Sequence, residues 1–286
     1  YDGDGGFHQV FIGLGYKVFN NLSVGANFSY LYGDITHQSM TTIGATDTRS
    51  IKLDKFSISD YKLDFGLQYT YKLNKKNTIN IGAVYTLGRT LHGDAYKYHQ
   101  TGAESNGSIY VQSQTGDTIP NPFKMPHTFG IGLTYVYDNR LTIGVDYTLQ
   151  KWNTADLAWS KFNKESVEMN SRTKIAFGAE FVPSYISHNY LKRIRYRMGA
   201  YYSTPYNKVS YTSPDTGTTS FQDGAREYGV SIGFGLPMFQ SKSMLNISGQ
   251  YIKVSPKFKG LMEENYLRIN IGLTFNERWF MKWKVD

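Results

Sequence analysis

The chain has 286 residues, a formal net charge of +8 and no cysteine. Without cysteine it has no disulfide framework, no thiolate metal site and no cysteine nucleophile. The basic excess does not indicate nucleic-acid binding, because Lys and Arg are spread over turns, the C-terminal tail and polar strand positions instead of forming one stripe.

Apolar and polar residues alternate along segment after segment. In the clearest early case, 22–33, one parity is apolar and the other is small or polar. The apolar members are Leu22, Val24, Ala26, Phe28, Tyr30 and Tyr32. Because a β-strand sends successive side chains to opposite faces, this period of two predicts a strand with one apolar face and one wet face.

About eleven such segments follow one another, each close to the roughly 9–11 residues that a tilted strand needs to cross a bilayer. They lie near 10–18, 22–33, 61–73, 79–87, 129–137, 141–150, 175–181, 194–202, 228–236, 245–251 and 267–275. The apolar parity carries no charge at strand centres, as lipid contact requires, which disfavours a soluble β-sandwich. The sequence therefore predicts an all-β fold, a transmembrane antiparallel β-barrel, as a single domain spanning 1–286.

The links between these strands alternate in length. Short links lie at 19–21, 74–77, 138–140 and 240–243, with a medium one at 184–192. Long links lie at 34–57, 92–124, 153–170, 204–224 and 255–263. Bacterial barrels have short periplasmic turns and longer outer loops, so we expect the tail, 276–286, in the periplasm. The first strand then runs inward, and since such barrels have even strand numbers, we expect an odd number of strands outside this sequence and a sheet that these residues alone do not close.

Several sequence segments resemble the FadL/TodX family of outer-membrane transporters for hydrophobic compounds, and its Bacteroidota members in particular. They lie at 22–33, 141–152, 196–202, 227–237 and 276–280. The resemblance implies a fourteen-stranded barrel with an N-terminal plug, of which three strands, the plug and the kinked strand of the lateral exit would be absent here. It also implies that the outer loops 34–57 and 92–124 form a hydrophobic capture site.

Those two loops carry a group of apolar residues that form the predicted ligand-capture site. The members are Met40, Ile43, Ile51, Leu53, Phe56, Ile109, Tyr110, Val111, Ile119, Phe123 and Met125. Exposed apolar patches usually mark interaction sites. The alternative is that these residues pack the loops on each other or extend the strands past the membrane.

The wet parity carries charges of both signs, which we expect in the barrel interior. They are Lys62, Asp64, Asp146, Lys174, Glu180, Arg195, Arg197, Glu227 and Arg268. Pairing among themselves or with a plug is the first interpretation, since unpaired lumenal charges must be hydrated. The alternative is a polar gate, in which Arg195 and Arg197 would grip a ligand carboxylate.

Signals for catalysis are weak. Residues 229–233 match G-x-S-x-G, but that motif acts at a strand-to-helix elbow and here lies within a strand. The six histidines lack metal spacing, the acidic start at Asp2 and Asp4 lacks the rest of a cation loop, and the aromatic and basic tail 278–284 suits the membrane interface. The chain is therefore expected not to be an enzyme and to need no cofactor.

The leading functional hypothesis is outer-membrane transport of hydrophobic small molecules, fatty-acid-like or aromatic, with membrane lipid and the ligand as partners. A rival hypothesis is a FadL-like barrel that serves as a structural or docking subunit of an outer-membrane secretion or assembly complex, with other outer-membrane or periplasmic proteins as partners. A general polar porin is the third.

Overall fold

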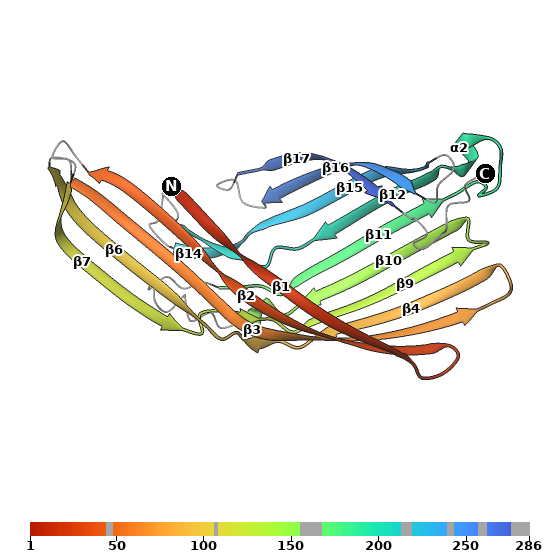
Figure 1. Cartoon of the computed structure of the whole chain (residues 1–286), viewed down its shortest axis with the longest axis horizontal. Coiled ribbons are helices and arrows are strands. Elements are labelled where there is room, and N and C mark those ends of the chain that lie inside the picture. The colour runs from red at the N-terminus through yellow and green to blue at the C-terminus, as the bar shows by residue number, and fades with distance from the viewer. Residues whose placement is uncertain are drawn as a thin grey trace, which may run out of the picture.

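The computed structural model describes residues 1–43, 48–105, 108–154, 168–212, 219–238, 243–256 and 262–275. A thirteen-stranded antiparallel sheet dominates it, and its main path follows chain order (Figure 1). The path consists of β1 (Asp2–Lys17), β2 (Leu22–Ile43), β3 (Thr48–Lys72), β4 (Asn77–Thr86), β9 (Thr128–Tyr137), β10 (Leu141–Gln150), β11 (Arg172–Phe181), β12 (Arg195–Ser203), β15 (Ala225–Pro237), β16 (Met244–Pro256) and β17 (Glu264–Thr274). These strands confirm the predicted fold class and the eleven predicted strand positions.

The other elements are short or branch from this path. Strands β6 (Gly93–Ser105) and β7 (Ser108–Pro120) form a hairpin that pairs with β3. Two small ribbons pair β5 (Arg89–Thr90) with β8 (Lys124–Met125) and β13 (Lys208–Thr212) with β14 (Thr219–Asp223). The helical turns are η1 (Trp152–Thr154) and α2 (Tyr190–Arg193). Within the described ranges, the helices are too short and polar to cross a membrane.

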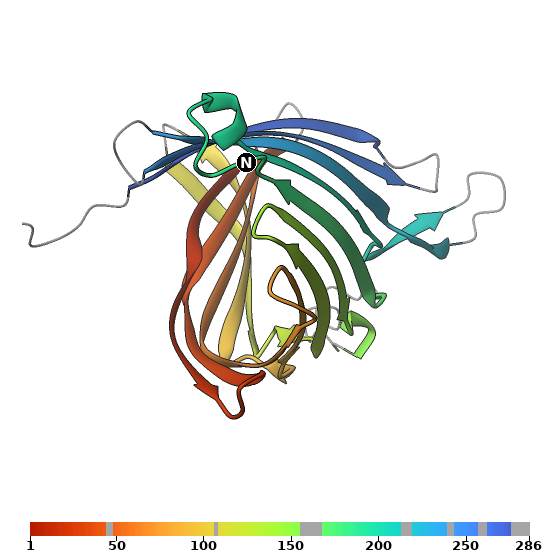
Figure 2. The ribbon, with the colours of Figure 1, turned by 90° about the vertical axis from the view of Figure 1, so that its right-hand side faces the viewer.

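The main sheet curves into an arc (Figure 2). Among the described residues, β1 and β17 each pair with one neighbour only, β2 and β16 respectively, so these strands are the two free edges of the path. The described strands therefore form an open sheet, and how the barrel is closed stays a prediction.

One face of the arc is apolar from edge to edge, because the register brings the apolar parities of neighbouring strands together. One cross-strand row contains Leu22, Tyr69, Ile81, Leu133, Val145, Phe177, Ala200, Val230, Tyr251 and Leu267. Leu22 is half-buried and the other members are exposed, with Tyr69 at 39% and Leu267 at 77%. A continuous band of exposed apolar side chains is what a lipid-facing wall requires.

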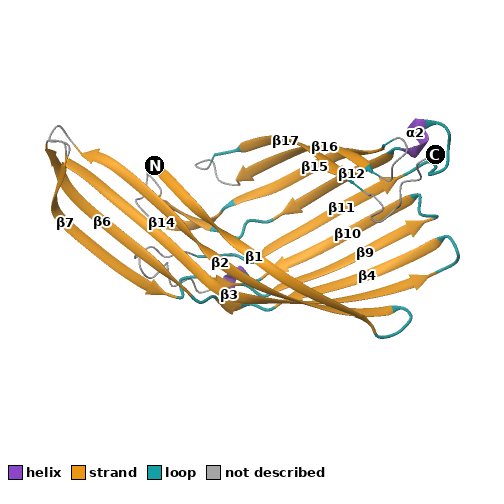
Figure 3. Ribbon diagram, in the orientation of Figure 1, coloured by secondary structure: helices purple, strands orange, loops and turns teal. Residues whose placement is uncertain are grey.

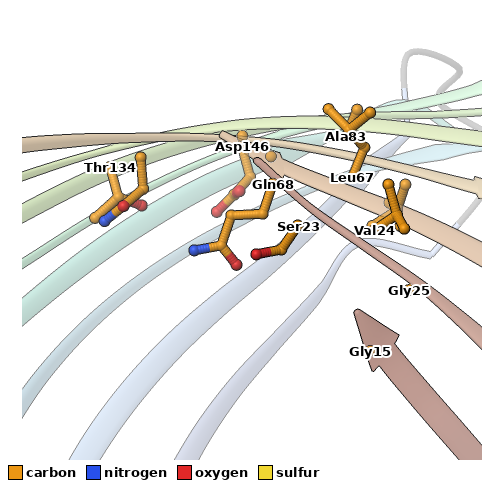
Figure 4. A pocket seen from close by; sticks show the side chains of 14 residues that line it. Gly15, Ser23, Val24, Gly25, Leu67, Gln68, Ala83, Thr134 and Asp146 are labelled. Carbon is orange, nitrogen blue, oxygen red and sulfur yellow. The ribbon is translucent and has the colours of Figure 1, made fainter. Parts of the chain in front are cut away.

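The opposite face is polar and lines the concave side. Figure 4 shows Ser23, Gln68 and Asp146 on one side of the sheet, whereas Leu67 and Ala83 point away on the other. The polar side chains border a hollow of about 570 Å³ that spans β2, β3, β4, β9 and β10. The alternation predicted for β3, with Leu67 outward and Gln68 inward, is therefore confirmed.

Two segments predicted as loops, 34–57 and 92–124, are mostly strand, as the long orange ribbons at one end of Figure 3 show. Strands β2 and β3 have 22 and 25 residues and stay in one unbroken register from Leu22–Tyr69 to Ile43–Thr48. We call 34–43, 48–60, β6 and β7 the extension. The loop prediction was wrong because neither parity of the extension is apolar throughout. In β3 the apolar residues change sides, from Ile51 and Leu53 on one face to Phe56 and Ile58 on the other.

Two glycines on neighbouring strands, offset by two residues in the β1–β2 register, mark the point where the extension begins. Gly5 and Gly33 have φ of +98° and +138°, which side-chain-bearing residues rarely adopt. A Cβ on Gly33 would lie 2.2 Å from the backbone oxygen of Gly6. The two glycines allow β1 and β2 to bend together while they remain paired.

Candidate functional site

The polar face carries a charged cluster close to the end with the short turns. Glu180 on β11 accepts hydrogen bonds from Arg195 Nη1 (3.2 Å) and Arg197 Nε (2.7 Å), both on β12. Arg197 Nη1 also donates to Asn246 Oδ1 on β16 at 2.8 Å. Both arginines predicted as a carboxylate grip therefore already hold a carboxylate of the chain, in support of the pairing interpretation.

Glycines on β15 make room for the inward side chains of β12. A Cβ on Gly229 would lie 2.0 Å from the Tyr201 ring, and one on Gly235 would lie 3.1 Å from Arg195 Cβ. A Cβ on Gly233 would lie 3.7 Å from Arg197 Cβ. The G-x-S-x-G phrase at 229–233 lies within β15, and its glycines serve close packing along the wall.

Replacing Gly229 with valine should destabilise the barrel by about 1–3 kcal/mol, because Tyr201 must leave its position over β15 and its hydroxyl must leave Glu227. Urea unfolding in lipid vesicles measures the loss. The matched control is Gly178→Val, also on the polar face, where a new Cβ meets nothing within 4 Å. Equal stability of the two variants would contradict the close packing described here.

A second inward group lies toward the other end of β12. The Tyr201 hydroxyl donates to Glu227, Arg172 Nη2 lies 4.0 Å from Glu227 Oε2, and Lys174 Nζ lies 4.5 Å from the Tyr201 ring centroid. These contacts extend the pattern of paired charge along the wall.

The remaining predicted lumenal residues divide into paired and unpaired. Lys62 Nζ contacts Asp64 Oδ2 at 2.8 Å, and Asp64 Oδ1 accepts from Thr86 at 2.6 Å. Asp146 and Arg268 share the polar face, where Asp146 lies over Gly132, but neither forms an ion pair with the described residues. Their lumenal role stays a prediction.

The predicted capture residues do not form one cluster. Met40 lies opposite Ile51 in the β2–β3 ladder, and Leu53 shares their face. Phe56 lies on the reverse face, where its ring centroid is 5.4 Å from that of Phe123. The register therefore divides the apolar residues of β3 between the two sides of the extension.

The other predicted capture residues are scattered. Tyr110 and Val111 are exposed near the far end of β7, and Met125 pairs with Arg89 in the β5–β8 ribbon. Ile119 lies opposite Ala95, on the face that carries Phe56. Ile43 and Ile109 lie in β2 and β7, but their side chains fall outside what the structure describes.

Phe56 and Phe123 instead belong to a small core at the base of the extension. Ile58, Leu91 and Ala95 are its buried members, with exposures of 7%, 6% and 0%. Leu91 N–H donates to the backbone oxygen of Phe123, which joins the links before β6 and after β7. This core supports the alternative that these residues pack the two segments together.

Asp60 forms a charged junction beside this core that the sequence did not reveal. Its carboxylate is 3% exposed, lies 3.3 Å from Arg89 Nη2, and accepts from His92 N–H at 2.8 Å and Tyr61 N–H at 2.7 Å. The Arg89 guanidinium lies 3.7 Å from the centroid of the Tyr61 ring. Two segments of the chain, β3 and the link between β4 and β6, therefore meet at one buried carboxylate where the extension joins the wall.

The surroundings set the charge state of this junction, at the outer limit of the wall segment of β3. Burial raises the pKa of the Asp60 carboxyl, but hydrogen bonds from the His92 and Tyr61 backbone, the His92 ring and the Arg89 charge outweigh burial. The pKa is held below its ordinary value, so the ionised form is the stable one in the fold.

The model of the BamG family matches residues 1–286, the whole chain. The chain belongs to the BamG family. No curated protein sequence is significantly similar to it. Solved structures that resemble this BamG-family chain supply the comparison of its fold.

The toluene transporter TbuX of Ralstonia pickettii is 13% identical, with a TM-score of 0.56 over 95% of this chain and 67% of its own. The TodX ΔS2S3 mutant monoaromatic hydrocarbon channel is 13% identical, with a TM-score of 0.55 over 93% and 68%. A Pseudomonas aeruginosa FadL homologue is 13% identical, with a TM-score of 0.50 over 89% and 61%. The BamG-family chain thus has the fold of a FadL-type outer-membrane β-barrel and spans about two thirds of these barrels.

Proposed function

We propose that this chain is a docking subunit of an outer-membrane assembly or secretion complex, with the extension as its docking surface. The observation that carries the proposal is the length of β2 and β3, 22 and 25 residues, where about 9–11 suffice to cross a bilayer. About half of each strand therefore extends beyond the membrane. The BamG name also favours a role within a multi-protein assembly.

The build of the extension supports docking better than ligand capture. Its strands are paired throughout, with one register irregularity in the β6–β7 hairpin at Thr101/Gly102, and are anchored by the base core and the Asp60 junction. A capture site for a hydrophobic compound needs a concave, largely apolar pocket. The apolar residues here are divided between two faces or buried in the base core.

Transport of hydrophobic compounds is the second candidate, and the fold shared with TbuX and TodX favours it. The inward charges disfavour an apolar path along β11 and β12, because Glu180, Arg195 and Arg197 line that part of the wall.

Shortening the β6–β7 hairpin tests the two candidates together. Deleting 98–116 and joining Lys97 to its cross-strand partner Asp117 through Asn-Gly removes the far part of the hairpin and keeps the base core. If the chain is a docking subunit, the amount of membrane protein that co-purifies with the tagged shortened variant should be at least about tenfold lower than with the tagged wild-type chain. Uptake of toluene by intact cells should stay unchanged.

The control changes the opposite end of the strands. Lys75→Glu with Lys76→Glu alters an exposed short turn between β3 and β4 and should leave the complex intact. Retention of every partner by the shortened hairpin, together with reduced toluene uptake, would favour transport.

A further inference from the structure

Strand β7 is an exposed edge of the extension. Within the described residues it pairs with β6 alone, and Figure 1 shows it as the outermost strand of the hairpin. Nine consecutive residues, 110–118, are exposed, a pattern that β7 shares with the two edge strands of the main path, β1 and β17. A strand open on both faces and along one side presents a row of backbone donors and acceptors.

The ladder determines which backbone groups face outward. Asn121 N–H donates to the oxygen of Gly93, its neighbour across the hairpin, and Ser59 N–H donates to the oxygen of His92 on the other side of β6. Antiparallel pairs alternate between bonded and non-bonded. Residues 113, 115, 117 and 119 therefore bond to β6, and the N–H and C=O groups of Gln114, Gly116 and Thr118 point away from the sheet.

The central part of this edge lacks the features that normally protect an edge strand. Between Ser113 and Ile119 it has no lysine, no proline and one charge, Asp117. Protective features lie only at the two ends of that stretch, where Gln112 of β7 is an extra residue without a cross-strand partner and Pro120 ends the strand. Natural edge strands are usually blocked by Lys, Pro or bulges. The outward groups of Gln114 and Gly116 and the Thr118 C=O are left accessible, whereas the Thr118 N–H donates to Asp117 Oδ1 at 2.9 Å.

We propose that β7 accepts an extended strand of a partner protein, which continues the extension by one strand. The inference rests on the proposed docking function and names its contact: backbone hydrogen bonds to Gln114, Gly116 and Thr118. Gly116 leaves space at the centre, where a Cβ would lie 3.2 Å from the Tyr96 hydroxyl. A partner side chain crossing at Gly116 would rest against Tyr96.

The reverse face of the same edge offers a second receiving surface. A hollow of about 480 Å³ is bordered there by Lys52, His99, Thr115 and Asp117. Strand addition places alternate side chains of the guest on the two faces. The partner segment we infer therefore carries an apolar side chain toward Tyr96 and a polar side chain toward this hollow.

Residue-resolved hydrogen exchange on the full chain tests the proposal, with native outer-membrane vesicles compared against the purified protein. In vesicles, the amides of Gln114 and Gly116 should be protected at least about tenfold relative to the purified protein. The amides of Thr115 and Asp117 should be protected in both, because they bond to β6.

A double proline variant of the outward positions blocks strand addition, and the double alanine variant is its matched control. Gln114→Pro with Thr118→Pro removes two outward N–H groups and no bond to β6, whereas Gln114→Ala with Thr118→Ala keeps them. Only the proline pair should lose Gly116 protection and co-purifying partners, and continued protection of Thr115 and Asp117 reports an intact hairpin.

Three results would overturn the proposal. If a complex co-purifies while the outward amides stay unprotected, strand addition is refuted and the docking function is retained. If no complex is found at all, the docking function itself is refuted. Protection of the same amides in the purified protein that rises with its concentration would identify a second copy of the chain as the occupant.

Discussion

Replacing Asp60 with alanine is expected to destabilise the chain by about 3–5 kcal/mol, the cost of leaving a buried charge without its partner. Arg89 would keep its place over Tyr61 without a carboxylate, and the His92 N–H would lose its acceptor. Urea unfolding in lipid vesicles measures the change.

Asp54→Asn is the matched control, on the same strand and the same face. Asp54 Oδ1 is buried without a hydrogen-bond partner among the described atoms, so its neutralisation should cost less than about 1 kcal/mol. Equal losses of unfolding free energy for Asp54→Asn and Asp60→Ala would contradict the stabilising role assigned to the Asp60 junction.

The junction also gives stability a pH dependence. Because the folded-state pKa of Asp60 lies below its ordinary value of 3.8, its contribution is fully present above that value and is lost as the pH falls through the folded-state pKa. The stability difference between wild type and Asp60→Asn should therefore shrink below about pH 4. A difference that stays constant between about pH 5 and pH 2 would contradict this assignment.

The second large effect concerns the lipid-facing wall. Leu67→Arg places a cation near the middle of the apolar face, and we expect a loss of about 2–4 kcal/mol. Leu67 is 45% exposed and lies between Val24 and Ala83 in the sheet.

The neighbouring residue is the control for that change. Gln68→Arg turns the same charge toward the polar face and should cost less than about 1 kcal/mol. Unfolding midpoints in lipid vesicles compare the two variants, and similar midpoints would mean that β3 does not separate lipid from lumen at this level.

The wall could be predicted from sequence because lipid on one side and water on the other impose a period of two on every strand. Leu63, Phe65 and Leu67 carry that period without an exception in β3. The extension was missed because its apolar parity is not continuous: in β3 it passes from Ile51 and Leu53 on one face to Phe56 on the other.

The site residues show a similar division. Glu180, Arg195 and Arg197 were predicted as an inward charged group, since parity alone places them on one face. The Asp60 junction was not predicted, because Arg89 and His92 approach Asp60 only through the course of the chain between β4 and β6. Phe56 and Phe123 were assigned to capture because the sequence could not distinguish packing within the extension from exposure.

The partner exchange along β3 has a mechanical consequence. Its residues Thr48–Ile58 pair with β6, whereas Asp64–Lys72 pair with β4, so the sheet forks between these stretches while β2 runs unbroken beside both. A force applied to the tip of the hairpin would reach the barrel through β2 and β3. It would act first on the fork, where the contacts of the buried Asp60 carboxylate hold the extension to the wall.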